Sequence, residues 1–152
     1  MIMSDIEWDL PTPYTLSLTV HETDVDRLGH ANNVVYVRWL EDISWAHIES
    51  LGMTWELQLR EGRAMAITRT EIDYLGSALA GDNLILGTWL VDYDGRIRSA
   101  RRFQLVRCSD QRTIARAISR HACIDLKTQR PARIPQSIKT IMEGALVRGD
   151  ID

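Results

Sequence analysis

Apolar residues recur every three or four positions over residues 33–51, a period that predicts a long helix with one buried stripe. The members of this stripe are Tyr36, Val37, Leu40, Ile43 and His47 or Leu51. Asn32 or Asn33 can cap the start of the helix, and Gly52 stands where a C-terminal cap glycine belongs. Shorter helical patterns follow at 54–60 and 137–146.

An alternating period marks five other segments. Strands are predicted there, because β-branched or aromatic residues alternate fully or partly over 14–21, 64–75, 83–93, 97–108 and 113–126. Asp94-Gly95 is the cleanest hairpin signal between them. One strand, one long helix and then four strands joined by hairpins favour an α+β fold, in which an antiparallel sheet packs on the helix.

Composition narrows the class of protein. A chain of 152 residues with 45% hydrophobic content is long enough for a single domain over 1–152. The net charge of −3 argues against a general nucleic-acid binder. No apolar run approaches the ~20 residues of a membrane span, and the acidic N-terminus lacks the layout of a secretory signal, so we expect a cytoplasmic protein. Cys108 and Cys123 indicate neither a disulfide framework nor a zinc site.

The most polar segment is the turn T-D-V-D-R-L-G-H-A-N-N-V-V-Y, residues 23–36, between the first strand and the long helix. A turn of this kind places carboxylates beside the free amide groups of a helix start. An anion, or a carbonyl that develops negative charge, is best received there. The turn is therefore the leading candidate for a site.

Three sequence blocks carry a family resemblance. The turn D-x-D-x-x-G-H-x-x-N-x-x-Y, the later E-I-D-Y-L-x-x-A-x-x-G-D and the tail I-D-L-K-T-Q-R-P-A-R-I-P resemble the hotdog-fold acyl-CoA thioesterases of the 4-hydroxybenzoyl-CoA thioesterase type. The resemblance runs from about residue 14 to 135 in the family's order. It implies a sheet of about five strands wrapped around one helix, and a homodimer or homotetramer with active sites at the subunit interface. It also implies hydrolysis of acyl-CoA without a metal or other cofactor.

The same resemblance implies a catalytic role for Asp26, which matches the second acid of the turn motif. Its carboxylate would activate a water as general base or attack the thioester carbonyl itself. Bracing the turn is the alternative role of an aspartate there, and Asp24 is interpreted in that way. The Asn33 backbone amide matches the family's oxyanion donor, whereas capping the helix is the other role open to Asn32 and Asn33.

Three further residues have two interpretations each. Gly29 either supplies a backbone conformation closed to other residues or lets the substrate approach closely. His30 either acts in catalysis, by contacting the substrate carbonyl or the attacking water, or ties the loop to the helix. Tyr36 forms core or pocket wall, with its hydroxyl toward an acyl chain. The four histidines show no metal-ligand spacing.

The densest basic run in the chain consists of Arg96, Arg98, Arg101 and Arg102. A solvated strand face accounts for most of these arginines, while Arg96 and Arg98 are candidates for binding the phosphates of coenzyme A. The S-R-H stretch at 119–121 predicts that one face of the last strand is exposed or lies at an interface. The five tryptophans suggest either an aromatic acyl pocket or ordinary burial.

Two other functions stay open at this level. The acyl group can be carried by acyl carrier protein in place of coenzyme A, or the domain can bind acyl groups without cleaving them. A hydratase is less favoured, because Asp26 and His30 lie at a different spacing from the acid–histidine pair of hotdog hydratases.

Overall fold

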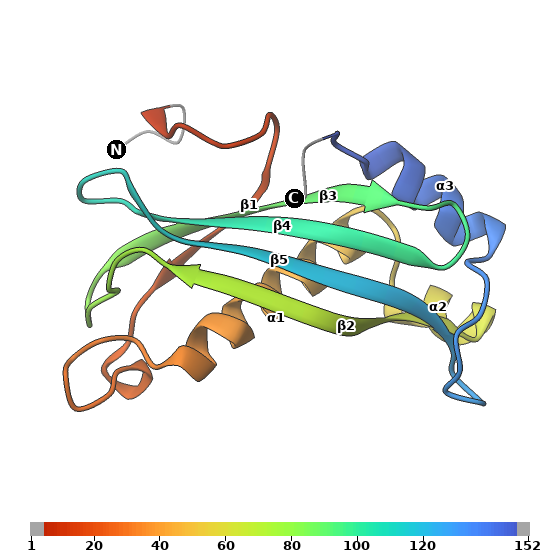
Figure 1. Ribbon diagram of the computed structural model, residues 1–152, viewed down its shortest axis with the longest axis horizontal. Coiled ribbons are helices and arrows are strands. Elements are labelled where there is room, and N and C mark those ends of the chain that lie inside the picture. Colours follow the sequence, from red (N-terminus) through yellow and green to blue (C-terminus); the bar gives the residue numbers. More distant parts are fainter. Residues whose placement is uncertain (1–4, 149–152) are drawn as a thin grey trace.

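The computed structural model describes residues 5–148 (Figure 1). The strands are β1 (Tyr14–Thr19), β2 (Arg63–Tyr74), β3 (Asn83–Tyr93), β4 (Arg98–Arg107) and β5 (Arg112–Asp125). The α-helices are α1 (Asn33–Ser50), α2 (Trp55–Glu61) and α3 (Gln136–Ala145). Within the described residues, no helix combines the length and the apolar character that crossing a bilayer requires.

The five strands form one antiparallel sheet in the order β1-β3-β4-β5-β2. Figure 1 shows α1 lying along one face of this sheet, with α2 and α3 at the end where α1 finishes. The expected α+β fold, an antiparallel sheet of five strands around one long helix, is confirmed. Because β2 pairs with β5 at the end of the strand order, it forms one edge of the sheet.

The predicted element boundaries agree with the structure to within two residues. The side chain of Asn32 caps α1, since its Oδ1 accepts the Val34 N–H at 3.2 Å. Gly52 follows the helix with a φ of +95°, which suits a C-terminal cap glycine. In the predicted hairpin, Asp94 Oδ1 accepts the N–H groups of residues 96, 97 and 98 at 2.8, 2.8 and 3.0 Å.

The buried stripe of α1 differs from the predicted one. Its buried residues are Val35, Tyr36, Trp39, Ile43 and His47. Val37 and Leu51 were expected in the stripe, but they are 46% and 38% exposed. Consecutive helical residues turn by about 100°, so Val37 points away from the sheet while Val35 and Trp39 face it.

Residues 6–11, called here the N-terminal strap, cover part of the face of the sheet opposite α1. Trp8 packs so closely on Gly87 that a Cβ at this glycine would lie 2.6 Å from the tryptophan Cζ3. Trp89 points to the same face, and its Nε1 donates a hydrogen bond to the Pro11 carbonyl at 2.9 Å. The strap therefore replaces solvent over the middle of β3.

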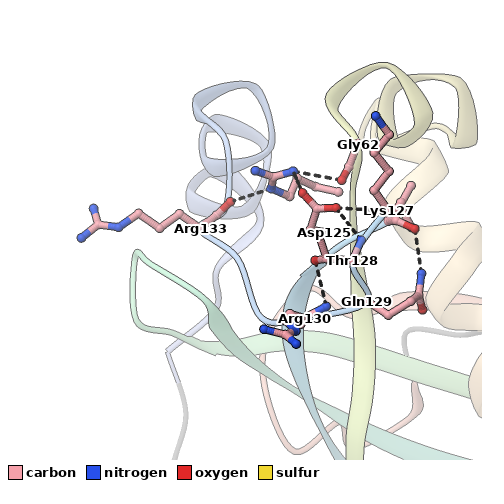
Figure 2. Close-up of polar contacts among 9 residues, drawn as sticks. Gly62, Asp125, Lys127, Thr128, Gln129, Arg130 and Arg133 are labelled. Atoms are coloured by element: carbon pink, nitrogen blue, oxygen red, sulfur yellow. Dashed lines mark hydrogen bonds and ion pairs between the residues drawn. The ribbon is translucent and has the colours of Figure 1, made fainter.

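The tail after β5 turns back toward the start of β2. Asp125 Oδ1 accepts the N–H groups of Lys127 at 2.8 Å and Thr128 at 3.0 Å (Figure 2). Its Oδ2 accepts a hydrogen bond from Arg63 Nη1 at 3.0 Å. The aspartate of the tail motif thus closes a turn and ties the end of β5 to β2.

Candidate active site at the polar turn

The polar turn is a tight loop closed by its own backbone. The Asp26 N–H donates to the His30 carbonyl at 2.8 Å, and the Gly29 N–H donates to the Asp26 carbonyl at 3.0 Å. Gly29 has a φ of +78°, a left-handed conformation that favours glycine. A Cβ at Gly29 would meet no atom within 4 Å. Backbone conformation, and not close packing within the chain, therefore requires glycine here.

The Asp26 carboxylate uses one of its oxygens to hold this loop. Oδ1 accepts the Leu28 N–H at 2.8 Å and the His30 N–H at 3.3 Å. Among residues 5–148, Oδ2 has no hydrogen-bond partner, and the residue is exposed. Asp26 therefore braces the turn, as the alternative interpretation held, and still leaves one carboxylate oxygen available for chemistry.

Asp24 has a structural role. It is buried, its Oδ2 accepts the His21 N–H at 2.9 Å, and its Oδ1 accepts from Arg38 Nη2 at 2.9 Å. The His21 N–H, and then the Arg38 guanidinium, hold the pKa of the Asp24 carboxyl below its usual value against the opposing effect of burial. Asp24 thus fixes the loop to α1 in its charged form.

The loop runs directly into the start of α1. Asn32 donates its N–H to the Asp24 carbonyl at 2.8 Å and caps the helix with its side chain. Asn33 is the first residue of the helix and is exposed. Its N–H is one of the amides that no intrahelical carbonyl can accept from, at the positive end of the helix dipole.

His30 and Tyr36 contact the segment before β3. The Nδ1 of His30 lies 3.4 Å from the Ser77 Oγ. Tyr36 is buried, and its hydroxyl accepts the Ala78 N–H at 3.3 Å. Burial raises the pKa of the Tyr36 hydroxyl. Both side chains therefore tie the turn and the first helical turn to residues 77–78, and Tyr36 belongs to the core.

Arg96 and Arg98 are not brought to the polar turn of the same chain. They belong to the hairpin between β3 and β4, and the Arg96 carbonyl accepts the Ile134 N–H at 2.8 Å. Figure 1 places this hairpin at the end of the sheet near α3, whereas α1 begins at the opposite end. Both arginines are exposed.

Arg101 was not identified as a functional candidate, and the expectation of a solvated face is wrong for it. The residue is only 5% exposed. Because side chains alternate along a strand, Arg101 shares the inward face of β4 with Phe103 and Leu105. Ser119 lies directly opposite it on β5 and is also buried, whereas Arg120, on the other face of the strand, is half-buried. That one face at 119–121 is exposed or lies at an interface stays a prediction, and it concerns the face of Arg120. Counting in steps of two from Phe103 would have found the buried arginine.

A cavity of about 300 Å³ lies beside Arg101. It is enclosed by the C-terminal half of α1 together with α2, α3 and β2. Its polar lining residues are Ser99, Arg101 and His121 from the sheet and Glu41, Ser44 and Gln58 from the helices, and the remaining lining is apolar. Trp45 belongs to that lining, whereas Trp39 and Trp89 are buried in the core.

Known proteins resemble this chain in sequence and in structure. The chloroplastic acyl-acyl carrier protein thioesterase ATL3 of Arabidopsis thaliana is 25% identical over 127 residues, which make up 84% of this chain and 66% of that protein. The chain therefore spans just under two thirds of that relative's length.

Two solved structures share the fold. A 1,4-dihydroxy-2-naphthoyl-CoA thioesterase from Synechocystis superposes with a TM-score of 0.76 at 20% identity, covering 86% of this chain and 96% of that one. A Staphylococcus aureus protein solved in complex with CoA superposes with a TM-score of 0.83 at 18% identity, covering 96% and 92%.

The family itself follows from the sequence match. The family model described as the Thioesterase-like superfamily matches residues 20–141. This range contains the polar turn, α1, α2 and strands β2 to β5. The chain therefore belongs to the Thioesterase-like superfamily.

Proposed function

We propose that the enzyme hydrolyses an acyl-CoA thioester to a free carboxylic acid and coenzyme A at the polar turn. Asp26 acts as general base or nucleophile, and the Asn33 amide stabilises the oxyanion. The observation that carries this proposal is the divided use of the Asp26 carboxylate, whose Oδ1 is held by two N–H groups while Oδ2 has no partner among residues 5–148. A carboxylate positioned by its own loop needs little reordering before it reacts.

Two chemical routes are compatible with this carboxylate. As a general base, Asp26 takes a proton from water, the hydroxide oxygen bonds to the thioester carbon, and the C–S bond then breaks to release the coenzyme A thiolate, which is protonated. As a nucleophile, a carboxylate oxygen bonds to the same carbon and expels the thiolate. Water then cleaves the resulting anhydride and restores Asp26.

In both routes the thioester oxygen gains negative charge. The Asn33 N–H lies at the start of an 18-residue helix, where the dipole favours an anion. Asn32 caps the helix with its own side chain, which leaves the Asn33 amide for the substrate. One donor of this kind contributes ~3 kcal/mol to transition-state stabilisation.

The neighbouring residues shape the place where the thioester lies. In this proposal His30 contacts the carbonyl or the attacking water, and Ser77 orients its ring through Nδ1. Gly29 lets the substrate pass close to the loop, because the space beside its Cα is open. Tyr36 forms the wall behind the loop, where its hydroxyl fixes the Ala78 N–H.

We propose that the enzyme is a homodimer, or a homotetramer built from such dimers, joined through the β2 edges of two sheets. β2 is 12 residues long and pairs on one side only, and Ile67, Tyr74 and Leu75 expose apolar surface along or beside it. Antiparallel pairing of two β2 strands sets the end of one next to the start of the other. The partner's hairpin with Arg96 and Arg98 then approaches this chain's turn and contacts the coenzyme A phosphates.

Acyl carrier protein is the second candidate carrier. It is favoured by one observation, the name of the Arabidopsis relative, which acts on acyl-acyl carrier protein. The test therefore presents the same acyl group on both carriers.

The deciding experiment measures thiol release from acyl-CoA and acyl-carrier-protein thioesters by wild type, Asp26→Asn and Asp26→Ala. Asparagine keeps an acceptor oxygen for the Leu28 and His30 N–H groups but cannot act as base or nucleophile, so we expect a rate at least about a hundredfold lower with the fold intact. Alanine removes the bracing as well, and we expect it to lower the melting temperature too.

Asp42→Asn, on the exposed side of α1, is the matched control and should retain the wild-type rate. Full activity of Asp26→Asn would show that Asp26 only braces the turn. A wild-type protein that cleaves none of these thioesters would refute the proposal.

A further inference from the structure

Arg101 is a charged side chain between helix and sheet, with few partners. It projects from β4 toward α1, where its Nη1 lies 2.7 Å from His47 Nδ1 and donates to Thr88 Oγ1 at 3.3 Å. Since a guanidinium can only donate, His47 Nδ1 is the acceptor and the ring carries its proton on Nε2. Among residues 5–148, the Nε and Nη2 groups of Arg101 have no acceptor.

No carboxylate neutralises this arginine within the described part of the chain. Burial and the positive charge of Arg101 lower the pKa of both His47 and His121 to about 4, so neither histidine adds or removes charge near neutral pH. Burial lowers the pKa of Arg101 itself to about 10, which leaves it protonated. The interior therefore holds an uncompensated positive charge, an arrangement that costs stability.

A second polar group beside Arg101 lacks a partner. Ser119 pairs with Arg101 across β4 and β5, so both side chains project to the same face of the sheet. The Ser119 Oγ is buried and has no hydrogen-bond partner among residues 5–148. Ser119 does not line the cavity beside Arg101, so the guanidinium of Arg101, which does, is the group suited to an anion with acceptor oxygens.

The cavity next to Arg101 supplies the rest of a ligand site. Its volume of about 300 Å³ falls in the range of small-molecule pockets. Apolar lining comes mainly from Trp45, Ile48, Met53, Met65, Ile141 and Met142. A ligand here thus meets apolar walls along its length and a cation at one end.

We propose that this cavity, the Arg101 pocket, binds an apolar organic group that ends in a carboxylate, with the carboxylate on Arg101. The carboxylate belongs either to a free carboxylic acid or to the far end of an acyl group whose thioester lies at a polar turn. The second source rests on the proposed function.

The second source also needs the dimer. α1 is 18 residues long, about 27 Å, and the Arg101 pocket lies along its C-terminal half while the polar turn precedes its start. Pocket residues Ala66 and Ile67 lie toward the start of β2. Antiparallel pairing of two β2 edges would bring them near the partner's polar turn, so that an acyl group reaches from one subunit into the other.

The test of binding uses two probes of equal length, octanoate and 1-octanol, measured by isothermal titration calorimetry. We expect octanoate to bind wild type at least tenfold more tightly than octanol, and Arg101→Met to abolish that difference. Arg112→Met, an exposed arginine at the start of β5, is the matched control and should keep it. Equal binding of the two probes by wild type would overturn the proposal.

A fold measurement separates a binding role from a structural one. Methionine in place of an unpaired buried charge is expected to keep or raise the melting temperature. If Arg101→Met instead fails to fold, Arg101→Lys serves, because lysine keeps the charge but loses the planar pair of donors, and it should weaken octanoate at least threefold while octanol is unchanged. Unchanged octanoate affinity in Arg101→Lys and a collapsed Arg101→Met would show that Arg101 is structural.

The source of the carboxylate is settled with thioesters. If the acyl group supplies it, kcat/KM for suberyl-CoA exceeds that for octanoyl-CoA at least tenfold, and Arg101→Met removes this preference. If a free acid supplies it, octanoate binds as predicted but suberyl-CoA has no advantage. Octanoate binding by a wild type that cleaves no thioester on either carrier would support the pocket and refute the proposed function.

Discussion

Acidification should destabilise this protein through two of its histidines, His47 and His121. The perturbation is a change from pH 7.5 to 4.5. The pKa of His47 and of His121 is lowered from 6.5 to about 4, in each case by burial first and then by the charge of Arg101. Between these two values the unfolded chain binds more protons than the folded one, so the free energy of unfolding falls as the pH falls.

The magnitude follows from the same two values. Between pH 7.5 and pH 4.5, each histidine lowers the free energy of unfolding by ~2.5 kcal/mol, and the pair lowers it by ~5 kcal/mol. The free energy of unfolding of a whole domain is only about 5–15 kcal/mol, so this loss is a large part of it. Asp24 and Asp94 have pKa values lowered below 3.8, so their stabilisation is lost only at more acidic pH.

Urea unfolding followed by tryptophan fluorescence measures this effect at several pH values, in buffers that contain no carboxylate. His121→Gln keeps a neutral polar side chain and should roughly halve the dependence on pH. A free energy of unfolding that changes by less than about 1 kcal/mol between pH 7.5 and 4.5 would refute the reasoning, because the buried histidines would then protonate as readily as in the unfolded chain.

Two further predictions concern the surfaces of the sheet. Gly87→Ala places a Cβ 2.6 Å from the Trp8 ring and should lower the free energy of unfolding by about 1–3 kcal/mol, measured by thermal unfolding. Gly144→Ala, which has open space in α3, should be neutral or stabilising, and equal melting temperatures of the two variants would contradict this reasoning. If the β2 edges pair as proposed, sedimentation equilibrium should return at least twice the 17.4 kDa chain mass, and a monomer at micromolar concentration would exclude the interface site.

The fold was predictable because its determinants are local. The 3.6-residue period of α1 and the two-residue period of the strands are set by neighbours in sequence. Asp94-Gly95 likewise marks its hairpin through contacts within four residues of Asp94. The exact face of α1 was missed at Val37, because the apolar stripe is wider in sequence than the surface that the sheet covers.

The interior around Arg101 could be predicted only in part. A run of arginines predicts an exposed segment, because arginine is rarely buried in proteins. Only the position of Arg101, two residues before the core residue Phe103, indicates that its side chain points inward. The partners, His47 and Thr88, come from α1 and β3, so their approach depends on tertiary packing that no local pattern contains. At the polar turn the motif located Asp26, while the division of labour between its two oxygens needed coordinates.

The N-terminal strap limits how copies of this protein can assemble. A sheet with one bare face offers other copies two kinds of contact, by its edges and by that face. Here Trp8 and Pro11 already occupy part of the second, over Gly87 and Trp89. Two copies that stacked through this part of the sheet would first have to displace residues 8–11, whereas contact through the β2 edge would leave them in place.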